Sequence, residues 1–261
     1  MPNPLRFPSA ALPGARRRFL HQLGLGAALF TVRGAFAEQL ARPTAWTTEG
    51  PFYPPKLPLD TDNDLIIVND AITPAIGEIA HLTGRLLDAK GEPVRHATIE
   101  IWAVDGTGVY LADRANQAKF DANFQGFGRF LTGSTGEYYF RTLKPVVYPG
   151  RSAPHIHFKI KTKGQPAWTT QLFIKGHPGN ERDGVYQEIG DAQARATVTR
   201  EFTPLKGSTL GEQAAQFDII LGATAREDEQ GNLRGGRRGP PPGGRRGGPP
   251  PGDNGANPPR Q

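Results

Sequence analysis

The 261-residue chain contains no cysteine. Disulfides therefore cannot stabilise it, and its fold has to rest on a hydrophobic core and on any bound metal. The same absence rules out zinc-finger sites and iron–sulfur clusters, because both need thiolate ligands. A metal site in this chain would have to use nitrogen and oxygen ligands.

The N-terminal region lacks an apolar run long enough to cross a bilayer. Its run from Leu20 to Val32 has about 13 residues, whereas a spanning helix needs roughly 20. Arginines at 16–18 precede the run, and "AFA", a small-x-small cleavage pattern, follows it and ends at Ala37. This order is typical of an export signal, and "RR-x-FL" from Arg16 resembles the twin-arginine type.

We therefore expect residues 1–37 to be a twin-arginine-type signal peptide that is cleaved after Ala37. The mature chain, without a membrane span, would then be periplasmic or extracellular. An amphipathic N-terminal helix is the alternative interpretation.

Acidic residues are scarce at both ends of the chain. Residues 1–37 hold five arginines and no acid, and residues 234–261 hold six arginines and one aspartate. Each end therefore has a charge of +5, and removing both from the net charge of +6 leaves −4 for residues 38–233. A mildly acidic body gives no support to nucleic-acid binding.

The C-terminal segment, residues 225–261, has almost no apolar residues that could anchor a core. Its repeats of "RGG", "RRG" and "PPPG" predict a disordered tail, extended where it is rich in proline. The alternative is a tail that contacts acidic surface polymers through its arginines.

Between these ends the sequence predicts an all-β fold. Residues 38–80 form a polar, proline-rich lead that contains "TTEGPFYPPKLP", and residues 81–224 carry many short strand signals separated by turn residues, which is typical of a β-sandwich with long connecting loops. The segment 181–195 alone suggests a helical turn or two. The strand candidates read "HLTGRLLD", "ATIEIWAVD", "GRFLT", "GEYYFRTLK", "HIHFKIKTK", "WTTQLFIKG", "ATVTREFTPL" and "QFDIILG".

One strand candidate carries two histidines one residue apart. In a strand His155 and His157 project to one face, while Ile156, Phe158 and Ile160 share the other, as in a half-buried strand. Two adjacent imidazoles with no acid beside them are most simply explained by a shared metal ion. The alternative is an ordinary polar strand face.

Two tyrosines are further candidate ligands. Tyr148 lies in a turn restricted by Gly150 and by prolines, seven residues before His155, so both side chains can reach one point. Tyr110 follows a glycine-rich turn after a strand that ends at Trp102. Packing is the alternative role for each, because tyrosine is more often an amphipathic packing residue than a ligand.

At this point the sequence resembles a known family. Residues Trp102 to Tyr110, then "FDANFQGFGRFLTGSTGEYYFRTLKPVVYPGRSAPHIHFKI" and "TTQLF", are similar to the intradiol ring-cleavage dioxygenases, and most similar to the catalytic β-sandwich of the protocatechuate 3,4-dioxygenase type. "TTEGPFYPP" resembles that family's entry segment. The resemblance extends from about Thr47 to Leu221, and the ordered set Tyr, Tyr, His-x-His and Gln is more specific than any of its parts.

The resemblance implies a non-haem Fe(III) held by four ligands, Tyr110, Tyr148, His155 and His157. Physical chemistry agrees: a phenol with a pKa near 10 binds at neutral pH as phenolate only to a strongly Lewis-acidic ion. Fe(II) oxygenases usually combine two histidines with a carboxylate, and no Asp or Glu lies close to this pair in the sequence.

The family's reaction opens a catechol with O2 between its hydroxylated carbons and gives a muconate-type diacid. By this resemblance Tyr148 is the ligand that substrate displaces, Arg151 stabilises developing charge, and Gln171 is its partner. Arg151 lies four residues before His155, one more than we associate with the nearest relatives, so it could instead cap the turn or pair with a surface acid.

Two other functions stay open at this stage. One is a non-catalytic secreted β-sandwich that binds carbohydrate or peptide, and the other is an Fe(II) or copper oxidase using the same histidines. Which catechol would be the substrate, and whether the chain forms a homo-oligomer, cannot be derived from the sequence.

Overall fold

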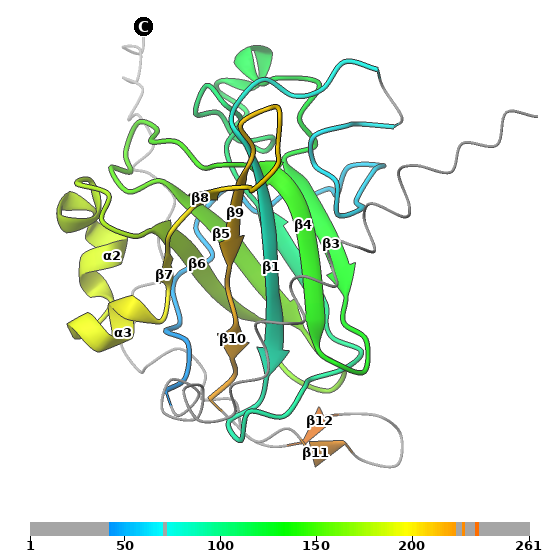
Figure 1. Ribbon diagram of the computed structural model, residues 1–261, viewed down its shortest axis with the longest axis vertical. Helices are drawn as coiled ribbons and strands as arrows, with labels where there is room; N and C mark the ends of the chain where they lie inside the picture. The colour runs from blue at the N-terminus through cyan, green and yellow to red at the C-terminus, as the bar shows by residue number, and fades with distance from the viewer. Residues whose placement is uncertain (1–41, 70–71, 223–225, 228–232, 235–261) are drawn as a thin grey trace, which may run out of the picture. The chain divides into compact units, whose positions relative to one another are not determined.

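The computed structural model describes residues 42–69, 72–222, 226–227 and 233–234 (Figure 1). The chain divides into two units, Met1–Gln39 and Leu40–Gln261, and all of the described residues belong to the second. The predicted signal peptide, residues 1–37, lies outside the described residues. So does most of the predicted tail, and both stay predictions.

The described chain builds two five-stranded sheets. In the first, β1 pairs with β4 on one edge and with β9 and β10 on the other, and β8 pairs with β9. Its strands are β1 (Ile79–Leu87), β4 (Glu137–Leu143), β8 (Thr203–Pro204), β9 (Gln213–Gln216) and β10 (Ile219–Ile220). The second has the order β3-β2-β5-β6-β7, made of β2 (Thr98–Trp102), β3 (Phe127–Leu131), β5 (His155–Lys161), β6 (Trp168–Ile174) and β7 (Thr199–Arg200).

The main core fills the space between the sheets. Ile156, Phe158 and Ile160 of β5 are fully buried in it, as their alternation predicts. The ring of Phe158 meets Tyr138 of β4 with centroids 6.1 Å apart and Phe217, between β9 and β10, at 5.1 Å. The all-β prediction is thus confirmed, and the packing of two sheets agrees with a sandwich.

Helices are few and short. α2 (Gly184–Glu188) and α3 (Ala192–Ala196) follow the 3-10 turn η3 (Asn180–Arg182). Together they extend one residue beyond each end of the segment 181–195, which the sequence predicts to make a helical turn or two. They lie beside β6 and β7 (Figure 1), where Tyr186 and Ile189 pack on Phe173 and Val198. A further 3-10 turn, η2, spans Gln117–Lys119. Among the described residues no helix is long and apolar enough to cross a membrane.

The lead segment covers the outer face of the second sheet. The amide of Thr47 donates to the carbonyl of Thr169 in β6 at 3.2 Å, and the hydroxyl of Thr170 donates to the carbonyl of Ala45 at 2.6 Å. Further along, Tyr53 packs edge-on against Trp102 with ring centroids 5.1 Å apart. Below this cover the two histidines of the outer face of β5, His155 and His157, are at most 2% exposed.

A buried carboxylate anchors the same cover. The side chain of Glu100 in β2 has no exposed surface, and it accepts hydrogen bonds from Tyr53 at 2.9 Å, Lys161 at 2.8 Å and Arg129 at 2.9 Å. A carboxylate can stay ionised in such a place only when it is paired and hydrogen-bonded. Glu100 therefore links the lead to β3 and β5.

Two segments differ from the sequence prediction. "ATVTREFTPL", predicted as one strand, divides into β7 in the second sheet and β8 in the first, because the chain crosses between the sheets at this point. In the predicted tail, β11 (Arg226–Glu227) and β12 (Leu233–Arg234) pair antiparallel, so the structure departs from predicted disorder at these four residues. Gly231 and Asn232, which favour turns, lie between them in the sequence.

The inter-sheet position of Phe158 generates a stability prediction. Phe158→Ala should lower the free energy of unfolding by about 3–5 kcal/mol, because it leaves a cavity between the sheets. Leu131→Ala, at a side chain that is 63% exposed, is the matched control and should change it by less than about 0.5 kcal/mol. Urea unfolding followed by tryptophan fluorescence measures both, and equal effects would contradict the assigned core.

Candidate metal and catalytic site

Strand register places three of the site residues in one row on the outer face of the second sheet. His157 lies directly opposite Trp102 of β2 on one side and Gln171 of β6 on the other. Directly opposed residues have neighbouring side chains on the same face. The indole of Trp102 accordingly stacks on the imidazole of His157, with ring centroids 4.6 Å apart and planes 10° apart.

A tight turn brings two more of the predicted residues together. Tyr148 and Arg151 form an antiparallel bridge, with the Arg151 amide donating to the Tyr148 carbonyl at 3.0 Å. Pro149 and Gly150 lie between them, and Gly150 has φ of +94°, the combination that a type II turn requires. Bridge partners direct their side chains to the same side, so the turn presents the phenol and the guanidinium together.

Tyr110 is held by a second loop. Its backbone bridges Val104, and the Asp105 carboxylate accepts hydrogen bonds from the amides of Thr107 at 2.8 Å and Val109 at 3.0 Å. Gly108, with φ of +89°, packs so closely on the neighbouring turn that a Cβ there would lie 3.2 Å from the Cβ of Tyr148. Glycine at this position therefore lets the two tyrosine-bearing loops meet.

The four predicted ligand residues converge. The hydroxyl oxygen of Tyr110 lies 3.0 Å from Nε2 of His157 and 3.2 Å from Nε2 of His155. The Tyr148 ring lies next to both groups, with its centroid 5.1 Å from that of Tyr110 and 5.6 Å from that of His155. Tyr110 and both histidines are at most 2% exposed, whereas Tyr148 is half-buried.

The surroundings orient the two imidazoles differently. Nδ1 of His155 lies 2.7 Å from the carbonyl oxygen of Ala153. Since a carbonyl only accepts, Nδ1 carries the proton and the Nε2 lone pair faces the cluster. His157 has a buried Nδ1 atom without a hydrogen-bond partner, and its ring stacks on Trp102. Gly50 lies beside the ring, where an added Cβ would be 3.4 Å from Cε1.

Burial keeps these groups neutral in the absence of a cation. It lowers the pKa of His155 to about 3, helped by the charge of Arg151, and lowers the pKa of His157 well below its ordinary value. It also raises the pKa of Tyr110 well above 10, an effect to which neighbouring Tyr148 adds, and raises that of Tyr148. Unprotonated imidazoles are ready to bind a metal, while the phenols need a strong Lewis acid to ionise.

Arg151 reaches the cluster in spite of its long sequence spacing. Its Nη1 atom lies 3.2 Å from Nε2 of His155, and its Nη2 atom donates to Oε1 of Gln171 at 2.9 Å. Nε and Nη2 also donate to the two carboxylate oxygens of Asp183 at 2.7 and 2.9 Å. The arginine therefore pairs with an acid, as the alternative interpretation held, but the acid is buried and the pair lies at the site.

Sequence reasoning missed several residues that shape the site. Asp183 lies 26 residues beyond His157, and no spacing pattern connects the two. Phe52 stacks on Tyr110 with centroids 4.6 Å apart, and the carbonyl of Thr48 accepts from Nε2 of Gln171 at 3.0 Å. "TTEGPFYPP" signalled the lead as an entry segment, but its contacts with the site were not foreseen.

The donor set fits a ferric ion. Two Nε2 atoms and the Tyr110 oxygen meet within hydrogen-bonding distance, with a second phenol adjacent, and the fixed tautomer of His155 directs a lone pair toward the same point. In the described part of the chain, no third His, Cys, Asp or Glu side chain joins the histidines in a group that could hold a metal. The neighbouring donors are phenols, which suit Fe(III) rather than zinc.

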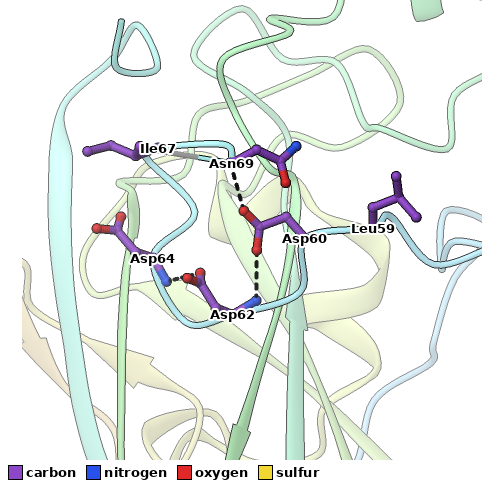
Figure 2. Close-up of a pocket in the computed structure, with 6 residues that line it drawn as sticks. All are labelled: Leu59, Asp60, Asp62, Asp64, Ile67 and Asn69. Atoms are coloured by element: carbon purple, nitrogen blue, oxygen red, sulfur yellow. Dashed lines mark hydrogen bonds between the residues drawn. The ribbon is translucent and has the colours of Figure 1, made fainter. Parts of the chain in front are cut away.

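A separate surface pocket of about 420 Å³ lies in the lead (Figure 2). The carboxylates of Asp60 and Asp62 accept the amides of Asn69 and Asp64 at 2.8 Å each, and Asp64 pairs with Arg141 at 3.1 Å. These carboxylates thus fold the loop. The pocket shares no residue with the tyrosine–histidine cluster.

Comparison with known proteins shows to which family the chain is similar. A family model described as Dioxygenase matches residues 48–223. The protocatechuate 3,4-dioxygenase beta chain of Burkholderia cepacia is 34% identical over 157 residues, covering 56% of this chain and 65% of its own length. The hydroxyquinol 1,2-dioxygenase of Corynebacterium glutamicum is 28% identical, covering 76% of this chain and 69% of its own length.

A solved structure is similar over its whole length. The dioxygenase domain of a dioxygenase–carbohydrate-binding protein fusion from Streptomyces sp. SirexAA-E is 25% identical, with a TM-score of 0.54. The match covers 69% of this chain and 99% of that domain. The segment that the family model matches, residues 48–223, contains the two sheets and the whole cluster.

The lowered pKa values of the histidines generate a pH prediction. Between pH 6.5 and about 3 the unfolded chain binds a proton at His155 that the folded metal-free protein does not, so unfolding becomes easier as the pH falls through this window. In the metal-free protein, His155→Gln should make the fall in unfolding free energy between pH 7 and pH 4 shallower.

The control is His96→Asn, at an exposed histidine whose φ of +56° suits asparagine. This variant should keep the wild-type slope in urea unfolding at the two pH values. An unchanged slope in His155→Gln would mean that the imidazole is protonated in the folded protein.

Proposed function

The chain belongs to the intradiol ring-cleavage dioxygenase family, and from this membership and the site we propose that it opens a catecholic ring with O2 between the two hydroxylated carbons, releasing a muconate-type diacid. The proposed ligands of a resident Fe(III) are Tyr110, Tyr148, His155 and His157. When bound, the ferric ion would supply the Lewis acidity that ionises the phenols and draws electron density from the ring.

The observation that carries this proposal is the convergence of the Tyr110 oxygen with two imidazole Nε2 atoms, at 3.0 and 3.2 Å, in a buried place. A polar strand face or a binding module has no need of three such atoms at one point away from water. The buried Nδ1 atom of His157 has no hydrogen-bond partner, and among the described residues the only polar contact of the ring is that of Nε2 with the Tyr110 oxygen at 3.0 Å.

The two tyrosines suit different roles. Tyr110 is 1% exposed, stacks on Phe52 and lies against both histidines, which supports its assignment as the ligand that stays in place. Tyr148 is half-buried on a tight turn, where its ring can swing without disturbing a strand. We assign Tyr148 as the side chain that gives way to substrate and takes a proton from an incoming catechol hydroxyl.

Arg151 supplies the charge that the reaction needs. Its Nη1 atom faces the cluster, whereas the N–H groups of Nε and Nη2 donate to Asp183 and Gln171. An N–H donor fixed beforehand toward developing negative charge stabilises a transition state without reorganisation. We therefore assign Arg151 to the substrate side of the site.

The place of action stays a proposal as well. Residues 1–37 support export by a twin-arginine-type signal, a route for proteins that are folded, and loaded with metal, before they cross the membrane. N-terminal sequencing of protein recovered outside the cytoplasm should begin at Glu38.

Iron and colour test the proposed function directly. Iron-loaded protein should show a broad tyrosinate-to-Fe(III) absorption band and consume O2 with at least one of catechol, protocatechuate and hydroxyquinol. Chelation under reducing conditions should abolish both properties, and iron, but not zinc, should restore them. Tyr110→Phe should weaken the band, while Tyr139→Phe, a tyrosine of the other sheet, should not. Colourless protein that still consumed O2 would refute the assignment.

Arg151 has its own test. Arg151→Ala should lower kcat by about 10²- to 10³-fold, the usual effect of removing one preorganised donor, with the absorption band intact. Arg85→Ala, which removes a surface arginine paired with Glu137, is the control and should keep wild-type kcat. Stopped assays of diacid formation measure both, and an unchanged rate in Arg151→Ala would end the assignment.

A further inference from the structure

The guanidinium of Arg151 is fixed along one of its edges by a single buried carboxylate. Asp183 has no exposed side-chain surface, and its two oxygens accept from Nε at 2.7 Å and Nη2 at 2.9 Å. Two parallel hydrogen bonds of this kind fix the plane of an arginine as well as its position. Gln171 takes a further hydrogen bond from Nη2 at 2.9 Å.

These contacts determine which N–H groups of the guanidinium are free to bind the substrate. With Nε and Nη2 committed, Nη1 carries the uncommitted N–H groups, and it lies 3.2 Å from Nε2 of His155. Because the guanidinium is planar and rigid, fixing one edge aims the other. The direction in which Nη1 faces the tyrosine–histidine cluster is therefore determined at Asp183.

Asp183 is itself held in place. Its Oδ1 accepts from the amide of Tyr186 at 3.1 Å and caps α2, and its Oδ2 accepts from the amide of Ala153 at 3.3 Å. Burial alone would raise the pKa of Asp183, but the hydrogen bonds and charge of Arg151 outweigh it, so the pKa lies below its ordinary value. The carboxylate is ionised and has a fixed position.

We propose that Asp183 is a positioning residue for ring cleavage, which aims Nη1 of Arg151 at the substrate bound to the cluster. The proposal rests on the proposed function. It also explains how an arginine four residues before His155 serves the site: the turn brings the guanidinium close, and a carboxylate from the segment after β6 orients it.

The main variant is Asp183→Asn. Asparagine caps helices as well as aspartate does, so α2 keeps its cap while the charged two-oxygen acceptor is lost. We expect kcat to fall by about 10²-fold, a typical cost of a misplaced catalytic group. The double variant Asp183→Asn/Arg151→Ala should be no slower than Arg151→Ala alone, because Asp183 acts through the arginine.

The chain offers a matched control. Asp191 also caps a five-residue helix, α3, through the amide of Ala194 at 2.8 Å, and it also pairs with an arginine, Arg42. Asp191→Asn should keep wild-type kcat. Equal losses in the two variants, or additive losses in the double variant, would show that Asp183 acts on the fold only and would overturn the proposal.

Two further readouts do not depend on turnover. In metal-free protein labelled with ¹⁵N, the Nε–H resonance of Arg151 should be protected from exchange and should lose that protection in Asp183→Asn. In iron-loaded protein without O2, Asp183→Asn should bind the catechol analogue 4-nitrocatechol within about 3-fold of wild type. A protected resonance in a wild-type protein that cleaves no catechol would count against the proposed function and, with it, the role of Asp183 as a positioning residue for that reaction.

Arg151→Lys covers the case in which Asp183→Asn does not fold. Lysine keeps the charge but cannot make two parallel hydrogen bonds to one carboxylate. The kcat of Arg151→Lys should therefore fall almost as far below wild type as the kcat of Arg151→Ala. Wild-type kcat in Arg151→Lys would show that orientation by Asp183 is not required.

Discussion

The register of three adjacent strands is the constraint on which the site depends. His157 stands between Trp102 and Gln171 because β5 pairs with β2 and β6 in one alignment. Since side chains alternate along a strand, a slip of one residue would send both histidines into the core and bring Phe158 to the outer face. The packing of Phe158 against Tyr138 and Phe217 opposes that slip. The core between the sheets thus determines where the imidazoles point.

The outer face of β5 shows how a polar strand face becomes a buried site. Most outer faces of a β-sandwich meet water, but the lead covers the histidine end of this one. The lead is tied to β6 by one backbone hydrogen bond and by side-chain hydrogen bonds, and to Glu100 through Tyr53. Exclusion of water makes the histidines poor bases and the phenols weak acids. The same exclusion would strengthen the interaction of these groups with the proposed trivalent cation, because little solvent is left to compete.

The surroundings of Arg151 connect this electrostatic situation to catalysis. A free guanidinium beside two neutral imidazoles would repel any cation bound there. Its pairing with the ionised carboxylate of Asp183 balances the charge, while Nη1 stays directed at the cluster. In the proposed reaction the arginine is a directional donor, and its side chain is held by contacts from three segments: the turn at Gly150, Gln171 of β6 and the cap of α2.

Much of this could be derived from residues that are close in sequence. Alternation of apolar and polar residues predicted β2 and β5, and glycine and proline predicted the turns. The spacing of His155 and His157 indicated that both side chains lie on the same face of a strand. Each of these properties depends on only two or three successive residues. The division of β7 from β8 was not foreseen, because propensity does not say which sheet a strand joins. The proposed set of four ligands came from the resemblance to a family, because the spacing of the residues alone did not connect the two tyrosines with the two histidines.

Tertiary structure decided which distant residues meet. Asp183 and Phe52 carry no local sign of a role, because a carboxylate or a ring acquires one only from the neighbour that the fold supplies. The spacing of Arg151 from His155 looked too long along the chain, yet a turn and a buried partner bring it into reach. The sequence by itself therefore determined the elements and the kinds of donor, through short-range periodicity and turn chemistry. The geometry of the site and its electrostatics arose from long-range contacts, which no local pattern encodes.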